Sequence, residues 1–185
     1  MTGWELPREA QIRGKTYHLH TDFREILKIF SHLQDESLPE FVRWYVALAL
    51  FYEEEIPEED FSEAAAFFCR FVNGGQEEPQ NPGPQLLHWE QDALDIVADV
   101  NKVAGREIRA LPFVHWWTFL GWFHAIGQGQ LSTVVAIRQK LQGKQKLEPW
   151  EQDFYRQNKA MVDMKAPLTE EEQAEKDRLN QLLGN

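Results

Sequence analysis

Histidines are the first residues in this sequence whose type and spacing could support metal binding or acid–base chemistry. His18 and His20 stand two positions apart in a segment that alternates apolar and polar residues, so both would point to one face of a strand. His115 and His124 share a later aromatic segment. Neither pair has the i, i+4 spacing with which a helix binds zinc, and a third ligand would have to come from elsewhere. We therefore expect no metal ion and no cofactor.

Carboxylates are the second candidate, because two acids in different environments of a cleft can perform hydrolysis. Six acids fall within residues 53–60, and Asp92, Asp95 and Asp99 form a row in a predicted helix. Acidic clusters this dense usually form solvated faces. The sequence has no serine-nucleophile or phosphate-loop motif, and Cys69 fits a small buried hydrophobe. We expect no catalytic residues and no enzymatic activity.

A short basic stretch contrasts with the acidic chain as a whole. Arg138, Lys140, Lys144 and Lys146 carry four positive charges with no acid between them, but their spacing does not place them on one helical stripe. The net charge of the chain is −11, which repels nucleic acids and anionic membranes. We expect neither as a partner. An ion pair with an acid is the alternative role of Arg138.

Length and composition are those of one globular domain. The 185 residues are 43% apolar and 12% aromatic, and the single cysteine excludes an internal disulfide. The N-terminus has no signal-peptide pattern, which favours a cytoplasmic protein. The longest apolar runs, 41–52 and 113–126, are shorter than the roughly 20 residues that a membrane-spanning helix needs.

Hydrophobic periodicity predicts an all-α fold of mainly six to seven helices with a short N-terminal β-hairpin. The hairpin is expected at about residues 10–20, with its turn at Gly14-Lys15. Helices 41–52 and 113–126 are nearly all apolar, so we expect them at the centre. The full set of helices is predicted over residues 21–33, 41–52, 60–73, 87–104, 113–126, 131–141 and 149–161.

The chain is expected to form a single domain over residues 1–165, with a Gly- and Pro-rich loop at 74–85. Residues 166–185 are predicted to form a further helix, because a capping-box spacing begins at Thr169. They contain few apolar residues. We expect this C-terminal helix to be loosely attached or to dock on a partner.

The aromatic segment 113–126 allows two interpretations. Trp116, Trp117 and Trp122 stand among other aromatic residues that cover more than the roughly 100° stripe facing a single core. Either the helix is central and surrounded by other helices, or it presents Trp residues to a partner, since aromatic residues often anchor interfaces. We favour the central position.

Several short stretches, taken in order over about residues 4–165, resemble one family. The most specific combination is His115-Trp116-Trp117-Thr118-Phe119 followed by Ile137-Arg138. The others are Trp4-Glu5-Leu6-Pro7, Thr21-Asp22-Phe23-Arg24, Leu50-Phe51-Tyr52, Trp89-Glu90-Gln91-Asp92-Ala93 and Tyr155-Arg156-Gln157-Asn158-Lys159. Together they resemble the bacteriophage "gene product fifteen" family of tail-region proteins. The loop 74–85 and the helix after Pro167 lie outside the resemblance.

This resemblance implies a protein of phage tail morphogenesis, encoded ahead of the tape-measure gene in siphophages and prophages. By analogy it implies a tail assembly chaperone in the bacterial host cytoplasm that binds the tape-measure protein and other tail proteins. It carries over no catalytic residues. We expect partner contacts or self-association at the aromatic helix and the C-terminal helix, through Trp116, Trp117, Trp122, Arg138, Leu179 and Leu182.

Three alternatives stay open. A structural virion component of the neck or tail would belong to the same phage setting but remain in the particle. An enzyme would need a well-formed pocket with convergent polar groups, which no motif indicates. A regulatory protein that acts on the host is the third.

Overall fold

The computed structural model describes residues 4–35, 37–77 and 83–164 of the chain. In order, these residues form β1 (Glu9–Ile12), β2 (Lys15–His18), α1 (Phe23–Leu33), α2 (Glu40–Phe51), the 3₁₀ helix η1 (Glu58–Asp60), α3 (Phe61–Val72), α4 (Ala93–Ala104), the 3₁₀ helix η2 (Ile108–Ala110), α5 (Trp116–His124), α6 (Gln130–Gln142), α7 (Pro149–Gln157) and α8 (Lys159–Val162).

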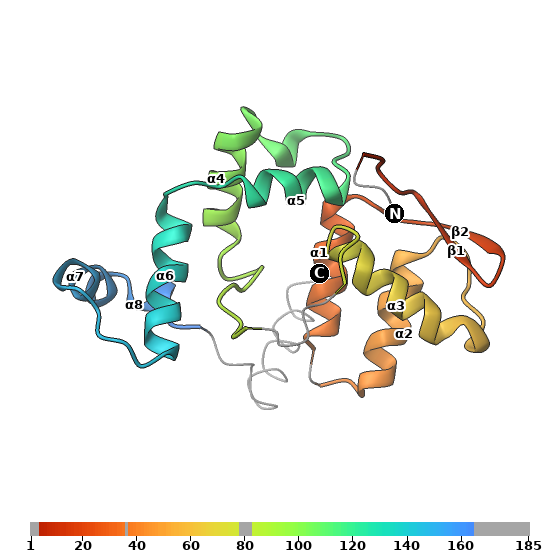
Figure 1. Ribbon diagram of the computed structural model, residues 1–185, viewed down its shortest axis with the longest axis horizontal. Coiled ribbons are helices and arrows are strands. Elements are labelled where there is room, and N and C mark those ends of the chain that lie inside the picture. Colours follow the sequence, from red (N-terminus) through yellow and green to blue (C-terminus); the bar gives the residue numbers. More distant parts are fainter. Residues whose placement is uncertain (1–3, 36, 78–82, 165–185) are drawn as a thin grey trace, which may run out of the picture.

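The helices follow one another along an arch (Figure 1). The hairpin and α1–α3 make one end, α4 and α5 make the middle, and α6–α8 make the other end. The prediction of a mainly helical fold with an N-terminal antiparallel hairpin is confirmed. The predicted C-terminal helix lies outside the described residues, and so do positions 78–82 of the predicted loop.

The hairpin packs one of its faces on the helices because its side chains alternate. Ile12 and Tyr17 are buried, while their neighbours face solvent. The turn is formed by Arg13 and Gly14, with φ angles of 47° and 79°, one residue earlier than predicted. Two positive φ angles match the twist of a two-residue hairpin, and this requirement sets the register.

Asp60 fixes the hairpin to η1. Its buried carboxylate accepts a hydrogen bond from the Tyr17 hydroxyl at 2.9 Å and lies 3.4 Å from Lys15 Nζ. Arg13 Nε is 3.6 Å from the other oxygen. The two bases of the hairpin therefore compensate a carboxylate that would otherwise be buried without a partner.

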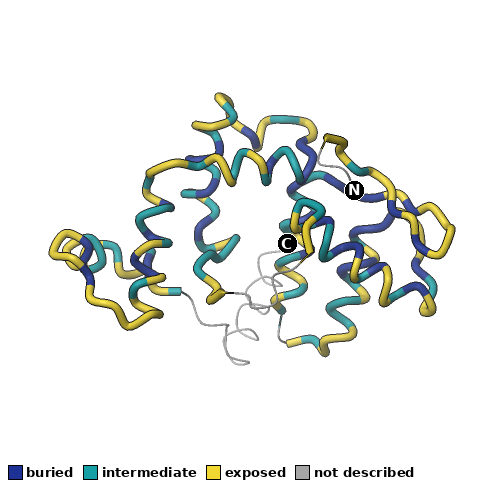
Figure 2. The backbone as a smooth tube through the Cα atoms, in the orientation of Figure 1, coloured by how far each residue is buried: buried dark blue, intermediate teal, exposed yellow. Residues whose placement is uncertain are grey.

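A large cluster of buried apolar side chains extends from the hairpin to the start of α6, and its members belong to the dark blue positions of the backbone in Figure 2. In the middle of the arch, α5 packs against α1 and α4. Phe119 of α5 stacks on Phe23 with 4.7 Å between ring centroids, and Trp116 meets Phe30 edge-on at 5.6 Å. These contacts place Trp116 and Phe119 in the core, while the other residues of α5 are half-buried or exposed, so the helix is not surrounded as the central interpretation predicts.

Two helices begin later than their periodicity predicts. Residues before α5 are extended because Phe23 N–H donates to the Val114 carbonyl at 3.0 Å and Trp116 N–H donates to the Thr21 carbonyl at 2.7 Å. The helix predicted from 113 therefore starts at Trp116. The helix predicted from 87 starts at Ala93, because a carboxylate oxygen of Asp92 accepts the His88 N–H at 2.9 Å and closes a turn first.

A second, smaller cluster of buried residues holds the far end of the arch. The predicted helix 149–161 is split there at Asn158, whose carbonyl accepts the N–H groups of Met161 and Val162 at 3.0 Å. The split turns α8 back toward α6, so that Val162 can fill the cluster. The cluster consists of Val134, Ile137, Leu147 and Val162.

Arg138 joins this smaller cluster to the rest of the fold. Its guanidinium forms two hydrogen bonds with the Asp92 carboxylate, at 2.6 and 2.8 Å. Its other N–H groups donate to the carbonyls of Val162, Leu86 and Met161 at 2.7–2.9 Å. All five donors are thus used by three separate segments. The side chains of the pair are 2% and 1% exposed, so water contributes nothing to their solvation.

Replacing Asp92 by Ala should lower the free energy of unfolding by about 3–5 kcal/mol, because it leaves a buried guanidinium without its counter-ion. Chemical denaturation of the purified protein measures this loss. The matched control is Asp153→Ala, which removes an ion pair with Arg156 whose side chains are 76% and 61% exposed. The control should cost less than about 1 kcal/mol. Equal losses in the two variants would contradict the role given to Asp92.

Candidate functional site

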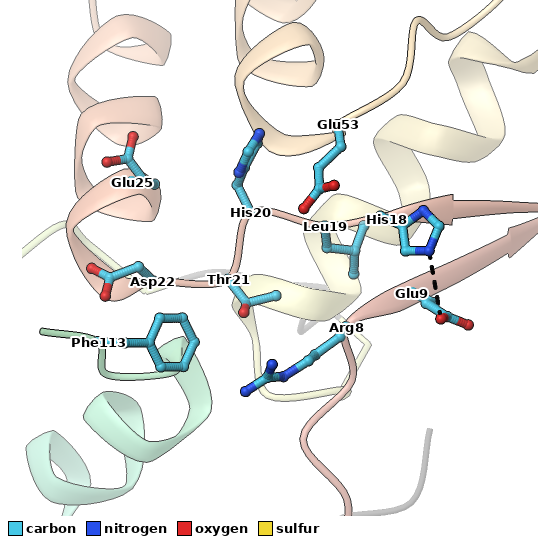
Figure 3. Close-up of a pocket in the computed structure, with 10 residues that line it drawn as sticks. All are labelled: Arg8, Glu9, His18, Leu19, His20, Thr21, Asp22, Glu25, Glu53 and Phe113. Carbon is cyan, nitrogen blue, oxygen red and sulfur yellow. Dashed lines mark ion pairs between the residues drawn. The ribbon is translucent and has the colours of Figure 1, made fainter.

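A polar hollow of about 450 Å³ opens where the hairpin, the β2–α1 connection, the end of α2 and the loop before α5 meet (Figure 3). Its size falls in the range of small-molecule pockets. The predicted pair His18 and His20 both line it, whereas His115 and His124 stand apart from it. The charged and aromatic residues of its wall are Arg8, Glu9, His18, His20, Asp22, Glu25, Glu53 and Phe113.

The charged groups in this hollow form ion pairs with each other and with residues next to them. His18 pairs through Nδ1 with Glu54, and this hydrogen bond raises the pKa of His18. Arg8 lies over the Phe113 ring, 5.3 Å from its centre. In the three described ranges, no group of three His, Cys, Asp or Glu residues could hold a metal ion. The wall of the hollow thus carries charges of both signs.

His115 has a structural role at the start of α5. Its Nδ1 accepts the Trp117 N–H at 3.0 Å and caps the helix. The proton must then lie on Nε2, which donates to the Pro7 carbonyl at 3.0 Å. Burial lowers the pKa of His115. The neutral ring thus ties the N-terminal segment to α5.

The three candidate tryptophans of α5 face the interior to different degrees. Trp116 is 1% exposed, while Trp117 and Trp122 are half-buried. The indole N–H groups of Trp116 and Trp117 donate to the carbonyls of Val72 and Phe71, at 2.9 and 2.8 Å. Binding of a partner at Trp116 would require the core to open.

The other candidate partner-binding residues lie elsewhere. Arg138 is buried in its ion pair with Asp92, which confirms the alternative role expected for it. Leu179 and Leu182 lie outside the described residues. Partner binding by Trp117, Trp122, Leu179 and Leu182 stays a prediction.

The acidic row of α4 is not the solvated face that its composition predicts, and that expectation is wrong. Asp92 and Asp99 are 2% and 5% exposed. Asp99 receives a hydrogen bond from Lys102 at 2.6 Å and lies against Gly129, where the Cβ atom of any larger residue would approach its carboxylate to 2.9 Å. The row faces α6, where Arg138 pairs with Asp92 and the Gln130 side chain donates to Asp95 at 3.1 Å, while Lys102 pairs with Asp99.

Two exposed aromatic rings lie on one face of α2, where the sequence did not indicate an exposed surface. Phe41 is 74% exposed and Tyr45 is 55% exposed. Ala49, also exposed, continues the same i, i+4 row along the helix. Tyr45 stacks on the half-buried ring of Phe61 in α3, with 6.0 Å between centroids. We call Phe41, Tyr45, Ala49 and Phe61 the α2 stripe.

The α2 stripe corrects the prediction that helix 41–52 is buried on most sides. Its inner face places Ala47, Leu48 and Phe51 in the core, but nothing in the described residues covers the outer face. A smaller hollow of about 250 Å³, lined by Leu33, Glu40, Arg43 and Trp44, adjoins the start of the helix. A helix that is apolar all round indicates either complete burial or a face left for a partner, and the sequence pattern alone does not separate the two.

The two histidines His115 and His18 should change stability with pH in opposite directions. The pKa of His115 is lowered from 6.5, so its contribution to unfolding free energy is present above about pH 6.5 and is lost as the pH falls through the folded-state value. The pKa of His18 is raised, so its contribution is present below about pH 6.5 and is lost as the pH rises through the folded-state value.

Melting temperatures of His115→Gln and His18→Gln, measured from about pH 8 to about pH 5, test these signs. The deficit of His115→Gln relative to the wild type should be largest at high pH and should shrink on acidification. Its size should be about 1 kcal/mol at high pH, the usual value of a helix cap. The deficit of His18→Gln should grow on acidification. A deficit of His115→Gln that is constant with pH would refute the neutral cap.

Comparison with known proteins identifies the family. A family model described as "Bacteriophage Gp15 protein" matches residues 4–164. No curated protein and no solved structure matches the chain. No helix in the described residues is long and apolar enough to cross a membrane. Because the family model covers most of the sequence, the chain belongs to the Bacteriophage Gp15 protein family and is a phage structural or morphogenesis protein.

Proposed function

We propose that this protein is a tail assembly chaperone, which binds the tape-measure protein through the α2 stripe before the tail tube forms. The observation that carries the proposal is the exposure of Phe41 and Tyr45 side by side on a helix whose opposite face is core. Contiguous exposed apolar surface on a folded protein is typical of an interaction site. Membership in a family of phage structural and morphogenesis proteins supports a phage protein as the partner.

The chemistry of the α2 stripe suits a client that must later be released. Helix-in-groove recognition uses aromatic and aliphatic anchors at i and i+4 spacing. A stripe of this size gives modest affinity to each copy, and many copies on one long client add avidity without slow release. The net charge of −11 keeps such a crowded assembly soluble.

The other predicted contacts have a secondary place in this proposal. Three further residues remain proposed contributors to client binding or self-association: the half-buried Trp122 of α5, and Leu179 and Leu182. Trp116 is buried and holds the end of α3, Arg138 holds the far end of the arch, and Trp117 stays a proposed contributor to client binding.

Substitution of the α2 stripe should abolish client binding. In co-expression with the neighbouring tape-measure gene, the wild type should keep the tape-measure protein soluble and co-purify with it. Phe41→Ser/Tyr45→Ser should lower the recovered complex at least about tenfold, because two anchor residues are lost. The matched control is Leu94→Ser on α4, which removes a side chain that is 77% exposed away from the stripe. Complex recovery unchanged by the double variant would refute the α2 stripe as the client site.

Mass spectrometry of purified phage particles separates a chaperone from the alternative, a structural component of the neck or tail. A chaperone should be absent from finished particles, while a structural component should be present at a fixed copy number. Detection at a fixed copy number would overturn the chaperone proposal. Melting curves of each variant accompany both experiments, so that loss of binding is distinguished from loss of folding.

A further inference from the structure

From the charges around the α2 stripe, we infer that its partner is a basic amphipathic helix, with apolar residues against the stripe and Lys or Arg residues beside it. This inference rests on the proposed function for the existence of a protein client, and it adds the chemistry of the segment that is bound. It does not require the client to be the tape-measure protein.

Carboxylates are concentrated along this part of the chain. Residues 40–63 contain eight acids and one base, Arg43. Three of the acids are already compensated: Asp60 by Arg13, Lys15 and Tyr17, Glu63 by Arg13, and Glu54 by His18. The other five are exposed and make no ion pair with any residue of the described ranges. They are Glu40, Glu53, Glu55, Glu58 and Glu59.

These five charges flank the residues of the α2 stripe in the sequence, and Glu53 also lines the polar hollow beside His18. Glu40 precedes Phe41 in the first turn of α2, and Glu53 and Glu55 follow the end of the helix. Glu58 and Glu59 belong to η1, and Asp60 separates them from Phe61. The apolar residues of the stripe therefore have acids before and after them along the chain. A partner that covers the aromatic rings must also bring its own charges close to these carboxylates.

Repulsion between like charges argues against a second copy of this chain as the partner of the α2 stripe. A two-fold interface would place the same surface on both partners. It would then set the acids of one copy against those of the other, and such like-charge contacts disfavour binding. A basic partner gains from every one of these contacts, and its attraction to the acidic surface also speeds association.

The geometry of the stripe favours a helical partner. Phe41, Tyr45 and Ala49 form a straight i, i+4 ridge, and helices pack by setting such ridges into the grooves of a neighbour. The small side chain of Ala49 leaves room for close approach, while the two large rings act as anchors. Lys and Arg residues that flank the apolar stripe of the partner would then reach the carboxylates on long, flexible side chains.

Three synthetic helical peptides of roughly 18 residues test this chemistry. The first has a Leu stripe and a Lys polar face, the second has the same stripe with Glu, and the third has the Lys residues but Ser in place of Leu. Fluorescence anisotropy of labelled peptides measures their binding to the full-length protein. Only the Leu/Lys peptide should bind well, and raising the salt from roughly 50 to 500 mM should weaken it about tenfold. Equal binding of the first two peptides, or of the first and third, would overturn the inference.

Variants of the protein connect this binding to the α2 stripe. Phe41→Ser/Tyr45→Ser should abolish binding of the Leu/Lys peptide, and Glu58→Gln/Glu59→Gln should weaken it roughly fivefold. The matched control Glu77→Gln removes one exposed acid that is not at the stripe and should leave binding unchanged. An effect of Glu77→Gln as large as that of the double Gln variant would refute a localised site.

The same variants distinguish failure of the inference from failure of the proposed function. If Phe41→Ser/Tyr45→Ser loses the tape-measure protein but the Leu/Lys and Leu/Glu peptides bind equally, the chaperone proposal stands and the basic partner is wrong. If the Leu/Lys peptide binds at the stripe but the tape-measure protein never co-purifies, the surface chemistry stands and the client is a different basic protein.

Discussion

The buried ion pair between Arg138 and Asp92 is the interaction on which the arrangement of the far half of the molecule depends. The smaller cluster of apolar residues is too limited to fix the orientation of α6, α7 and α8 by itself. Arg138 fixes that orientation through its planar guanidinium. The guanidinium bonds at once to the Asp92 carboxylate, to the Leu86 carbonyl and to two carbonyls of α8. The arch of Figure 1 is held by directional polar contacts at this end and by aromatic packing in the middle.

Most elements of the fold could be predicted from local patterns, and the errors have a common cause. Apolar periodicity and capping signals placed the hairpin and the helices within a few residues. Where a helix began later than predicted, other hydrogen bonds had replaced the helical ones, from a distant segment before α5 and from a nearby side chain before α4. α5 starts later than predicted because Thr21 and Phe23 pair, as in a strand, with the residues before it. α4 starts later because the Asp92 carboxylate accepts the His88 N–H.

The candidate site was harder to predict because burial is a property of the whole fold. Residues 41–52 and 113–126 are both rich in apolar side chains, and only the packing decides which of them keeps a face in water. The sequence favoured the tryptophans of α5 as the alternative partner surface, whereas the exposed rings belong to Phe41 and Tyr45 of α2. The prediction that the acidic row of α4 faces solvent failed for the same reason. Arg138, which pairs with Asp92 of that row, lies 46 residues away from it in the sequence.

The end of α3 is held both by its own glycine cap and by a neighbouring helix. Gly74 and Gly75 have φ angles of 67° and 85°, and the Gly75 N–H donates to the Arg70 carbonyl at 2.7 Å. The indoles of Trp116 and Trp117 hold the carbonyls of Val72 and Phe71, so the last turn of α3 is anchored by α5. The order of the last turn of α3 therefore depends on where α5 lies, so a change in the position of α5 reaches the chain at Val72 directly.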